Sequence, residues 1–209
     1  MRAYIFDNAF NGCSKLTSVD LSNVTSIESS GLNGAFRGCS RLTTIDLGKV
    51  TTLGNQSLQY AFNSCTRLTS VDLSKITTIN NYGLQYAFQS CTSLTSVDLS
   101  NLVTVGGDTF NSAFRACTGL TTMSFNNVSS IGPSGFRFAF NGCTNLTSLS
   151  FPALTTSSFG SYSNQFNNML QGCSGVTVHF PAAIQSKIGS WSSVTSGFGG
   201  TNTTVLFDL

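Results

Sequence analysis

Seven cysteines are the most reactive side chains in the sequence, and they recur at a fixed spacing. They lie at positions 13, 39, 65, 91, 117, 143 and 173, so five successive spacings are 26 residues and the last is 30. Such a series could form disulfides or hold a metal, but the count is odd and no Cys-x-x-Cys pair occurs. We therefore predict a column of free, buried thiols that pack as small apolar residues.

Acid–base catalysis has few candidate residues in this chain. His179 is the only histidine and Glu28 the only glutamate, and His179 falls at a strand position that should face outward. A serine or cysteine nucleophile needs an activating base with an orienting acid, and no spacing in the sequence suggests such a set. The sequence therefore predicts a protein that is not an enzyme and that has no cofactor and no resident metal.

Four aspartates recur with the period of the cysteines and are replaced by serine in later repeats. These are Asp20, Asp46, Asp72 and Asp98. Stacked carboxylates should repel one another, and basic residues recur nearby as Lys15, Arg41, Arg67, Lys49 and Lys75. We expect surface pairing between the acidic and basic columns; the alternative is a calcium-binding acidic strip. Asp46, Asp72 and Asp98 are candidate contact residues in either case.

A column of threonines runs through all the repeats, and serine or threonine follows each one. Its members are Thr17, Thr43, Thr69, Thr95, Thr121 and Thr147. High β-propensity with hydroxyl bonding between neighbouring repeats explains such a column. A hydroxyl-lined contact surface, centred on Thr43, Thr69 and Thr95, is a second interpretation, and an ice-binding threonine face is a more remote one.

Aromatic residues occupy one position that otherwise varies between repeats. Tyr60, Tyr86 and Phe138 lie five residues before a cysteine, where Gly34 and Ser112 stand in other repeats. Helical phase turns this position away from the apolar residues around it, so we expect these rings to be exposed. They are candidate contacts for sugar or protein, and lateral packing between repeats is the alternative.

The elements that position these columns follow from the period. Units of 20 to 50 residues at a fixed period indicate a solenoid, in which each coil buries its apolar face on its neighbours. Each unit has alternating apolar residues typical of a strand, then a shorter apolar pair, then apolar residues at relative positions 0, 3, 4 and 7, such as Leu84, Ala87, Phe88 and Cys91. We predict strand, short strand and about two helical turns per coil, with six to seven coils in all.

The pattern divides the chain into two parts. Residues 1–180 form the predicted solenoid, and residues 181–209 form a C-terminal cap with a helix opened by Pro181, a loop rich in serine and glycine, and a final strand over residues 203–209. No matching N-terminal cap is recognisable. We interpret the start as a segment of a longer chain or as a face covered by a partner.

The composition limits the classes of partner that the chain is expected to bind. Only 9% of the residues are charged and the net charge is +2, so the chain has no strong field to attract nucleic acid or anionic lipid. No apolar stretch of about 18 residues is present, so no membrane insertion is expected. The predicted exterior is neutral and is made of hydroxyl and amide groups.

The string A-F-x-x-C-x-x-L-T-x-[VI]-x-L, followed by V-T-x-[IL], resembles the BspA-like leucine-rich repeats over residues 6–180. The 26-residue period is longer than the usual unit of that family. The resemblance implies an α/β repeat fold, a right-handed leucine-rich-repeat solenoid with a parallel β-sheet and short helices. It also implies an extracellular place on a bacterial cell surface or a phage tail, and no catalytic residues.

From these observations we predict a non-catalytic recognition or adhesion module that binds protein or glycan on a cell surface. The main alternative is a purely structural spacer or assembly scaffold.

Overall fold

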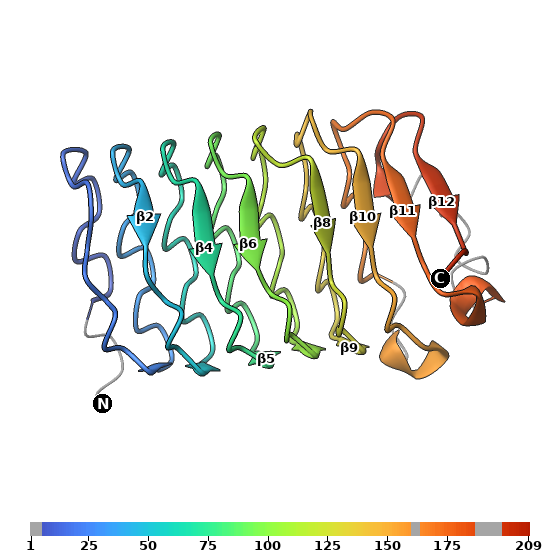
Figure 1. Ribbon diagram of the computed structural model, residues 1–209, viewed down its shortest axis with the longest axis horizontal. Helices are drawn as coiled ribbons and strands as arrows, with labels where there is room; N and C mark the ends of the chain where they lie inside the picture. The colour runs from blue at the N-terminus through green and yellow to red at the C-terminus, as the bar shows by residue number, and fades with distance from the viewer. Residues whose placement is uncertain (1–5, 160–163, 187–197) are drawn as a thin grey trace.

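The computed structural model describes residues 6–159, 164–186 and 198–209. Over these residues the chain winds into a parallel β-solenoid of about six turns, with the first coil at one end and the last strand at the other (Figure 1). No helix in these residues is long and apolar enough to cross a membrane. The solenoid predicted from the 26-residue period is confirmed, whereas its right-handed sense stays a prediction.

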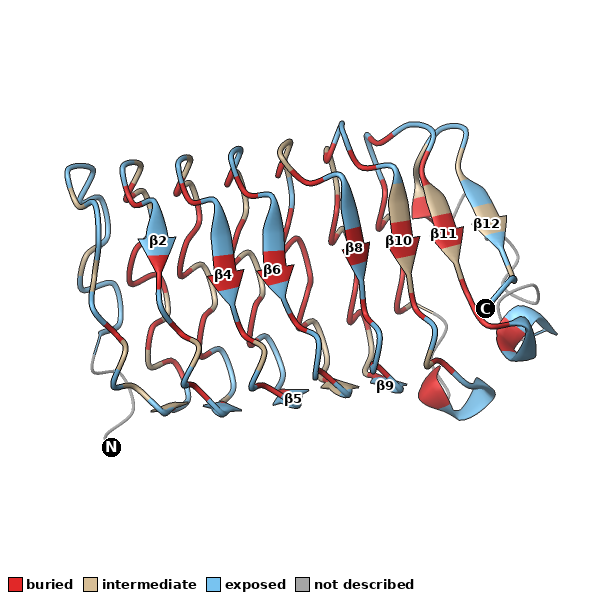
Figure 2. Ribbon diagram, in the orientation of Figure 1, coloured by how far each residue is buried: buried red, intermediate tan, exposed pale blue. Residues whose placement is uncertain are grey.

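One strand per coil builds the face that is turned to the viewer in Figure 1. These strands are β2 (Thr44–Ile45), β4 (Ser70–Asp72), β6 (Ser96–Asp98), β8 (Thr122–Ser124), β10 (Ser148–Ser150), β11 (Thr177–His179) and β12 (Thr204–Leu206). They pair in parallel, as one sheet in the order β2-β4-β6 and a second in the order β12-β11-β10-β8. The central residue of β4, β6 and β8 is buried and its two neighbours are exposed, which is the alternation expected of a strand with one face on a core (Figure 2).

Five coils contain a second strand of two residues, and these strands form another parallel sheet along the lower edge in Figure 1. Its strands are β1 (Ser26–Ile27), β3 (Thr52–Leu53), β5 (Thr78–Ile79), β7 (Thr104–Val105) and β9 (Ser130–Ile131), in that order. Each has an outward hydroxyl residue followed by a buried aliphatic one. The short second strand predicted from the sequence is therefore confirmed.

The segment before each cysteine is not a helix, contrary to our prediction. We call its nine residues, for example 56–64, the turn ribbon. Every fourth residue has a left-handed backbone, as at Gln56, Tyr60 and Ser64. Alternate N–H groups bond to the next coil, as from Phe62 to the Ala87 carbonyl at 2.9 Å, and the others bond three residues back, as from Cys65 to the Phe62 carbonyl at 3.0 Å. Half of the backbone donors thus join neighbouring coils instead of closing a helix.

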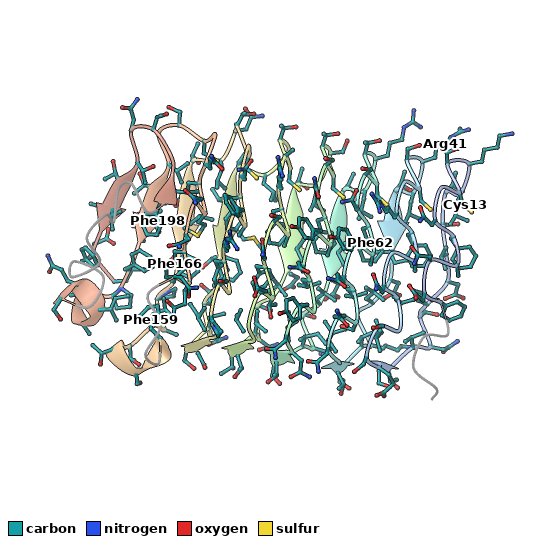
Figure 3. All side chains as sticks on the ribbon, turned by 180° about the vertical axis from the view of Figure 1, so that it is seen from behind. Cys13, Arg41, Phe62, Phe159, Phe166 and Phe198 are labelled. Carbon is teal, nitrogen blue, oxygen red and sulfur yellow. The ribbon has the colours of Figure 1, made fainter. Side chains whose placement is uncertain are left out.

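Apolar side chains from the same position of every coil stack in columns. Phe36, Phe62, Phe88 and Phe114 are fully buried and nearly parallel, with centroids 5.5 to 5.7 Å apart. Phe62 lies within this interior in Figure 3. Burial of large aromatic area in offset stacks is a major part of what holds the coils together.

The C-terminal end departs from the regular coil. Two short 3₁₀ helices, η1 (Thr156–Phe159) and η2 (Ala182–Ile184), flank β11, and β12 pairs with β11 as the final rung. β12 lies within residues 203–209, where the sequence predicts a final strand. The predicted helix after Pro181 begins with η2, and its later part, residues 187–191, lies outside the described residues. Phe159, Phe166 and Phe198, marked in Figure 3, are buried at this end of the core.

Candidate functional site

The predicted contact residues lie on two different surfaces. Asp46, Asp72 and Asp98 lie at or beside the strands that run from β2 to β6, with Thr43 and its equivalents just before them. Tyr60 and Phe138 belong to the turn ribbon instead. The structure therefore does not gather the candidates into one site, and each surface has to be judged from its own contacts.

The threonine hydroxyls are directed at the backbone of the coil before them. Thr69 donates from Oγ1 to the Thr43 carbonyl at 3.4 Å, and Thr95 donates to the Thr69 carbonyl at 3.1 Å. The hydroxyl protons are therefore engaged within the fold. This geometry supports hydroxyl bonding between coils, the first of our interpretations of the column.

The aspartates accept hydrogen bonds from the turn after their own strand. Asp72 Oδ1 accepts the Ser74 N–H at 2.8 Å and Asp98 Oδ1 accepts the Ser100 N–H at 2.9 Å. Hydrogen bonds from the hydroxyl and the N–H of Ser74 lower the pKa of the Asp72 carboxyl, with a smaller contribution from Lys75. The aspartates thus act first as turn-stabilising acceptors.

Direct pairing of the acidic and basic columns, which we predicted, is wrong. Within the described residues no lysine or arginine nitrogen lies within 4.0 Å of a carboxylate oxygen. Long basic side chains on an exposed surface gain little from fixed ion pairs, and the aspartates already have backbone donors. Arg41, for example, extends from the edge of the coil in Figure 3. The same part of the chain contains no group of three histidine, cysteine, aspartate or glutamate side chains that could hold a metal ion.

The turn ribbon carries the aromatic residues, which are half-buried and not fully exposed as we expected. The rings of Tyr60 and Tyr86 stack with centroids 4.7 Å apart and planes 4° from parallel. The Arg37 guanidinium lies 5.6 Å from the centroid of Tyr60, and Arg137 lies 5.1 Å from that of Phe138. Burial raises the pKa of the Tyr60 hydroxyl, the neighbouring Tyr86 raises it further, and Arg37 lowers it.

Amide side chains border the stacked tyrosines. Gln59 donates from Nε2 to Gln85 Oε1, and Asn63 donates from Nδ2 to Gln89 Oε1 at 3.1 Å, in both cases across neighbouring coils. Tyr82, one ribbon period before Tyr86, is 40% exposed. We call Gln59, Tyr60, Tyr82, Gln85, Tyr86 and Gln89 the tyrosine–amide patch. Of these six residues, the sequence alone pointed to only Tyr60 and Tyr86 as contact candidates.

The cysteine column consists of free thiols, and six of the seven are buried. Each buried thiol donates to a phenylalanine carbonyl in the coil before, as Cys91 Sγ does to Phe62 O at 3.1 Å. The sulfur atoms form a row through the coils in Figure 3, which ends at Cys13. Burial raises the pKa of the Cys65 thiol to about 12, and burial likewise raises the pKa of Cys91 well above its usual value. The predicted column of buried thiols is confirmed for six cysteines, whereas the prediction is wrong for Cys13, which is exposed in the first coil.

A thiol-labelling experiment follows from this arrangement. Iodoacetamide should modify Cys13 rapidly in the native chain near neutral pH, because this thiol alone is exposed among the seven. The six buried thiols should react only after unfolding in urea. Mass spectrometry of the intact chain and of its peptides gives the number and the position of the labels. Prompt native labelling of Cys65 or Cys91 would contradict the buried column.

One comparison with known proteins identifies the family of the repeat. The model of the BspA type leucine rich repeat region, in six copies, matches residues 3–137 and 85–191. The chain is a BspA-type leucine-rich repeat protein. Among solved structures, it is similar to internalin C2 from Listeria monocytogenes, with 18% identity and a TM-score of 0.38 over 80% of this chain and 72% of that one. No curated protein matches the sequence of this BspA-type protein.

The histidine of this BspA-type protein has a partner that sequence spacing did not suggest. His179 Nδ1 lies 3.1 Å from both carboxylate oxygens of Asp208, which follows β12. Ser150 is the register neighbour of His179 on β10. Within the described residues no hydrogen bond joins Ser150 to this imidazole. The His179–Asp208 pair joins β11 to the residues after β12.

Proposed function

We propose that the chain is a non-catalytic recognition or adhesion module of a bacterial surface or phage-tail protein, and that its ligand is a protein or glycan on a cell surface. The observation that carries the proposal is the tyrosine–amide patch on the outside of a rigid solenoid. Solenoids use such extended surfaces for binding, because identical coils fix the core and leave outward positions free to differ.

Backbone conformation supports a role for the tyrosine side chains themselves. Tyr60, Tyr82 and Tyr86 all have φ between 55° and 59°. Residues with a Cβ adopt this left-handed region at a cost of about 1–2 kcal/mol, which glycine avoids. Gly34 and Ser112 occupy the position of Tyr60 in other coils. The fold therefore accepts small residues at this position and does not need a large ring there. A role in contacting a ligand explains the tyrosines better than a role in maintaining the fold.

A structural spacer is the second candidate function, and the regular stacking favours it. The rings of Tyr60 and Tyr86 contact each other, so they also contribute to packing between coils. In a spacer these rings would only join neighbouring coils and would contact no ligand.

Binding to a cell surface separates the two candidates. Fluorescently labelled chain is applied to cultured epithelial cells and to bacterial cells, beside a variant that combines Tyr60→Ala with Tyr86→Ala. We expect the variant to lose about tenfold or more in apparent affinity, since large aromatic residues dominate binding surfaces.

The matched control is Val103→Ala, which removes an exposed apolar side chain just before β7 and outside the tyrosine–amide patch. This control should bind as the unaltered chain does, and circular dichroism should show all three proteins folded. A chain that binds neither cell type, or a double variant that binds as well as the control, would reject the recognition function and favour the spacer.

A further inference from the structure

We infer that the tyrosine–amide patch binds an uncharged glycan. This inference rests on the proposed recognition function and names the chemistry of its ligand. The inference is argued from two adjacent coils that place the stacked rings of Tyr60 and Tyr86 beside amide side chains hydrogen-bonded across the coils, all of them uncharged residues.

The two turn ribbons that contain the patch have no charged side chain. Residues 54–64 and 80–90 contain no aspartate, glutamate, lysine, arginine or histidine. Charged residues return in the ribbons on either side, with Arg37 before the patch and Asp108 and Arg115 after it. The six residues of the patch are themselves uncharged, and the guanidinium of Arg37 lies at its Tyr60 end, 5.6 Å from the ring centroid. A charged group of a sulfated or sialylated ligand held over Gln85 and Tyr86 would lose water and would find no complementary charge among the patch residues.

The amide side chains suit hydroxyl groups as partners. A sugar hydroxyl both donates and accepts hydrogen bonds, and an amide side chain offers both functions at adjacent atoms. The bond from Gln59 Nε2 to Gln85 Oε1 leaves the Gln59 oxygen and the Gln85 NH₂ group without a protein partner among the described residues. This cross-coil bond also holds the two side chains in place before a ligand arrives, so less side-chain entropy is lost on binding.

The tyrosines provide a ring face for the apolar side of a sugar. One face of Tyr86 packs on Tyr60, while within the described residues its other face meets no ring and no guanidinium. The C–H groups of a pyranose carry a slight positive charge, and the face of an aromatic ring is negative, so the two pack favourably. Tyr82, which is 40% exposed, adds a further tyrosine ring and hydroxyl.

A protein ligand fits this surface less well. Protein interfaces concentrate their energy in a desolvated apolar centre surrounded by polar groups. In the patch the polar amides Gln59, Gln85 and Gln89 lie beside the rings, and within these two ribbons Tyr82 is the only exposed large hydrophobic residue. A surface on which amide side chains lie beside aromatic rings fits a sugar, which has polar hydroxyl groups around its rim and apolar C–H groups on its faces.

The test uses an array that carries three classes of probe. These are neutral oligosaccharides and polysaccharides built of glucose, galactose, mannose, N-acetylglucosamine and fucose; sialylated and sulfated glycans; and enzymatically deglycosylated extracellular-matrix proteins. The unaltered chain should bind at least one neutral glycan. Tyr86→Ala and Gln85→Glu should each reduce that binding about tenfold or more, the first by removing the ring face and the second by removing the NH₂ donor and adding charge.

Phe138→Ala is the matched control, because Phe138 lies at the same ribbon position two coils away and outside the patch. It should leave glycan binding unchanged, and circular dichroism should confirm that each variant is folded. Binding only to deglycosylated proteins or to charged glycans would overturn the inference and leave the recognition function standing. Equal losses in Tyr86→Ala and Phe138→Ala would also overturn it. Binding to no probe would reject both the inference and the proposed function.

Discussion

Above about pH 9 the buried thiols should lower the free energy of unfolding of the chain by about 5–6 kcal/mol for each pH unit. The cause is the column of buried thiols. Burial raises the pKa of Cys65 to about 12, and burial raises the pKa of Cys91, Cys117 and Cys143 well above the ordinary value of 9.0. The solenoid thus holds at least four thiols that stay protonated while the unfolded chain loses its thiol protons.

The direction in which stability changes with pH follows from the number of protons that each state binds. Between about pH 9 and the folded-state pKa values, the unfolded chain binds fewer protons than the folded chain, so the free energy of unfolding falls as pH rises. Below pH 9 both states hold these protons and the stabilising contribution is fully present. Each thiol contributes about 1.4 kcal/mol per pH unit, and four of them give the expected slope.

Urea unfolding between pH 8 and pH 10.5, in the presence of a reductant and followed by circular dichroism, measures this slope. The informative quantity is the difference in slope between two proteins that differ in one thiol. Cys91→Ala removes one buried thiol, and its slope should be smaller by about 1.4 kcal/mol per pH unit. Cys13→Ala removes the exposed thiol and should leave the slope unchanged. Parallel slopes for all three chains would show that the buried thiols do not govern the alkaline transition.

Much of the fold could be predicted because the spacing of similar side chains in the sequence indicates which residues lie beside each other on neighbouring coils. In stacked coils of equal length, residues 26 positions apart are neighbours, as the pairing of Ser70 with Ser96 shows. The alternation of buried and exposed residues then locates the strands. For the same reason, the cysteine and phenylalanine columns could be predicted before any coordinates, since each column has one residue type in nearly every coil.

The turn ribbon could not be predicted from apolar spacing alone. Leu84, Ala87, Phe88 and Cys91 follow positions 0, 3, 4 and 7, and over two turns this pattern fits both a helix of 3.6 residues per turn and a ribbon that repeats every four. The distinguishing signal lay in the residues that accept a left-handed backbone. Glycine or serine precedes five of the first six cysteines, as at Gly38 and Ser64, and these residues favour turns over helix interiors.

The candidate site was harder to predict than the fold, because it depends on side-chain contacts that spacing does not determine. Tyr60 and Tyr86 were recognisable as outward-facing, but only coordinates show that they stack and become half-buried. The amide pair of Gln59 and Gln85 was overlooked because one glutamine position, taken alone, indicates nothing about chemistry. Aspartates that bond to their own turns looked like one half of an ion pair for the same reason.

Truncation of one central phenylalanine should destabilise the chain more than any single change on its surface. Phe88 is fully buried, with Phe62 and Phe114 stacked on its two faces at 5.6 and 5.5 Å between ring centroids. Phe88→Ala removes the buried ring and leaves a cavity between three coils, for which we expect a loss of about 3–5 kcal/mol. Hydrogen bonds join the turn ribbons of neighbouring coils, so these coils cannot easily move together to fill the cavity.

Phe10→Ala is the matched control, because the same column position in the first coil is only half-buried. Its loss should be about 1–2 kcal/mol, in proportion to the smaller apolar area that it buries. Urea unfolding near neutral pH gives both values, and Phe88→Leu, which keeps most of the volume but removes the stacked ring, should fall between them. Equal losses for Phe10→Ala and Phe88→Ala would mean that the coils unfold independently, since a cooperative stack depends most on the rungs with neighbours on both sides.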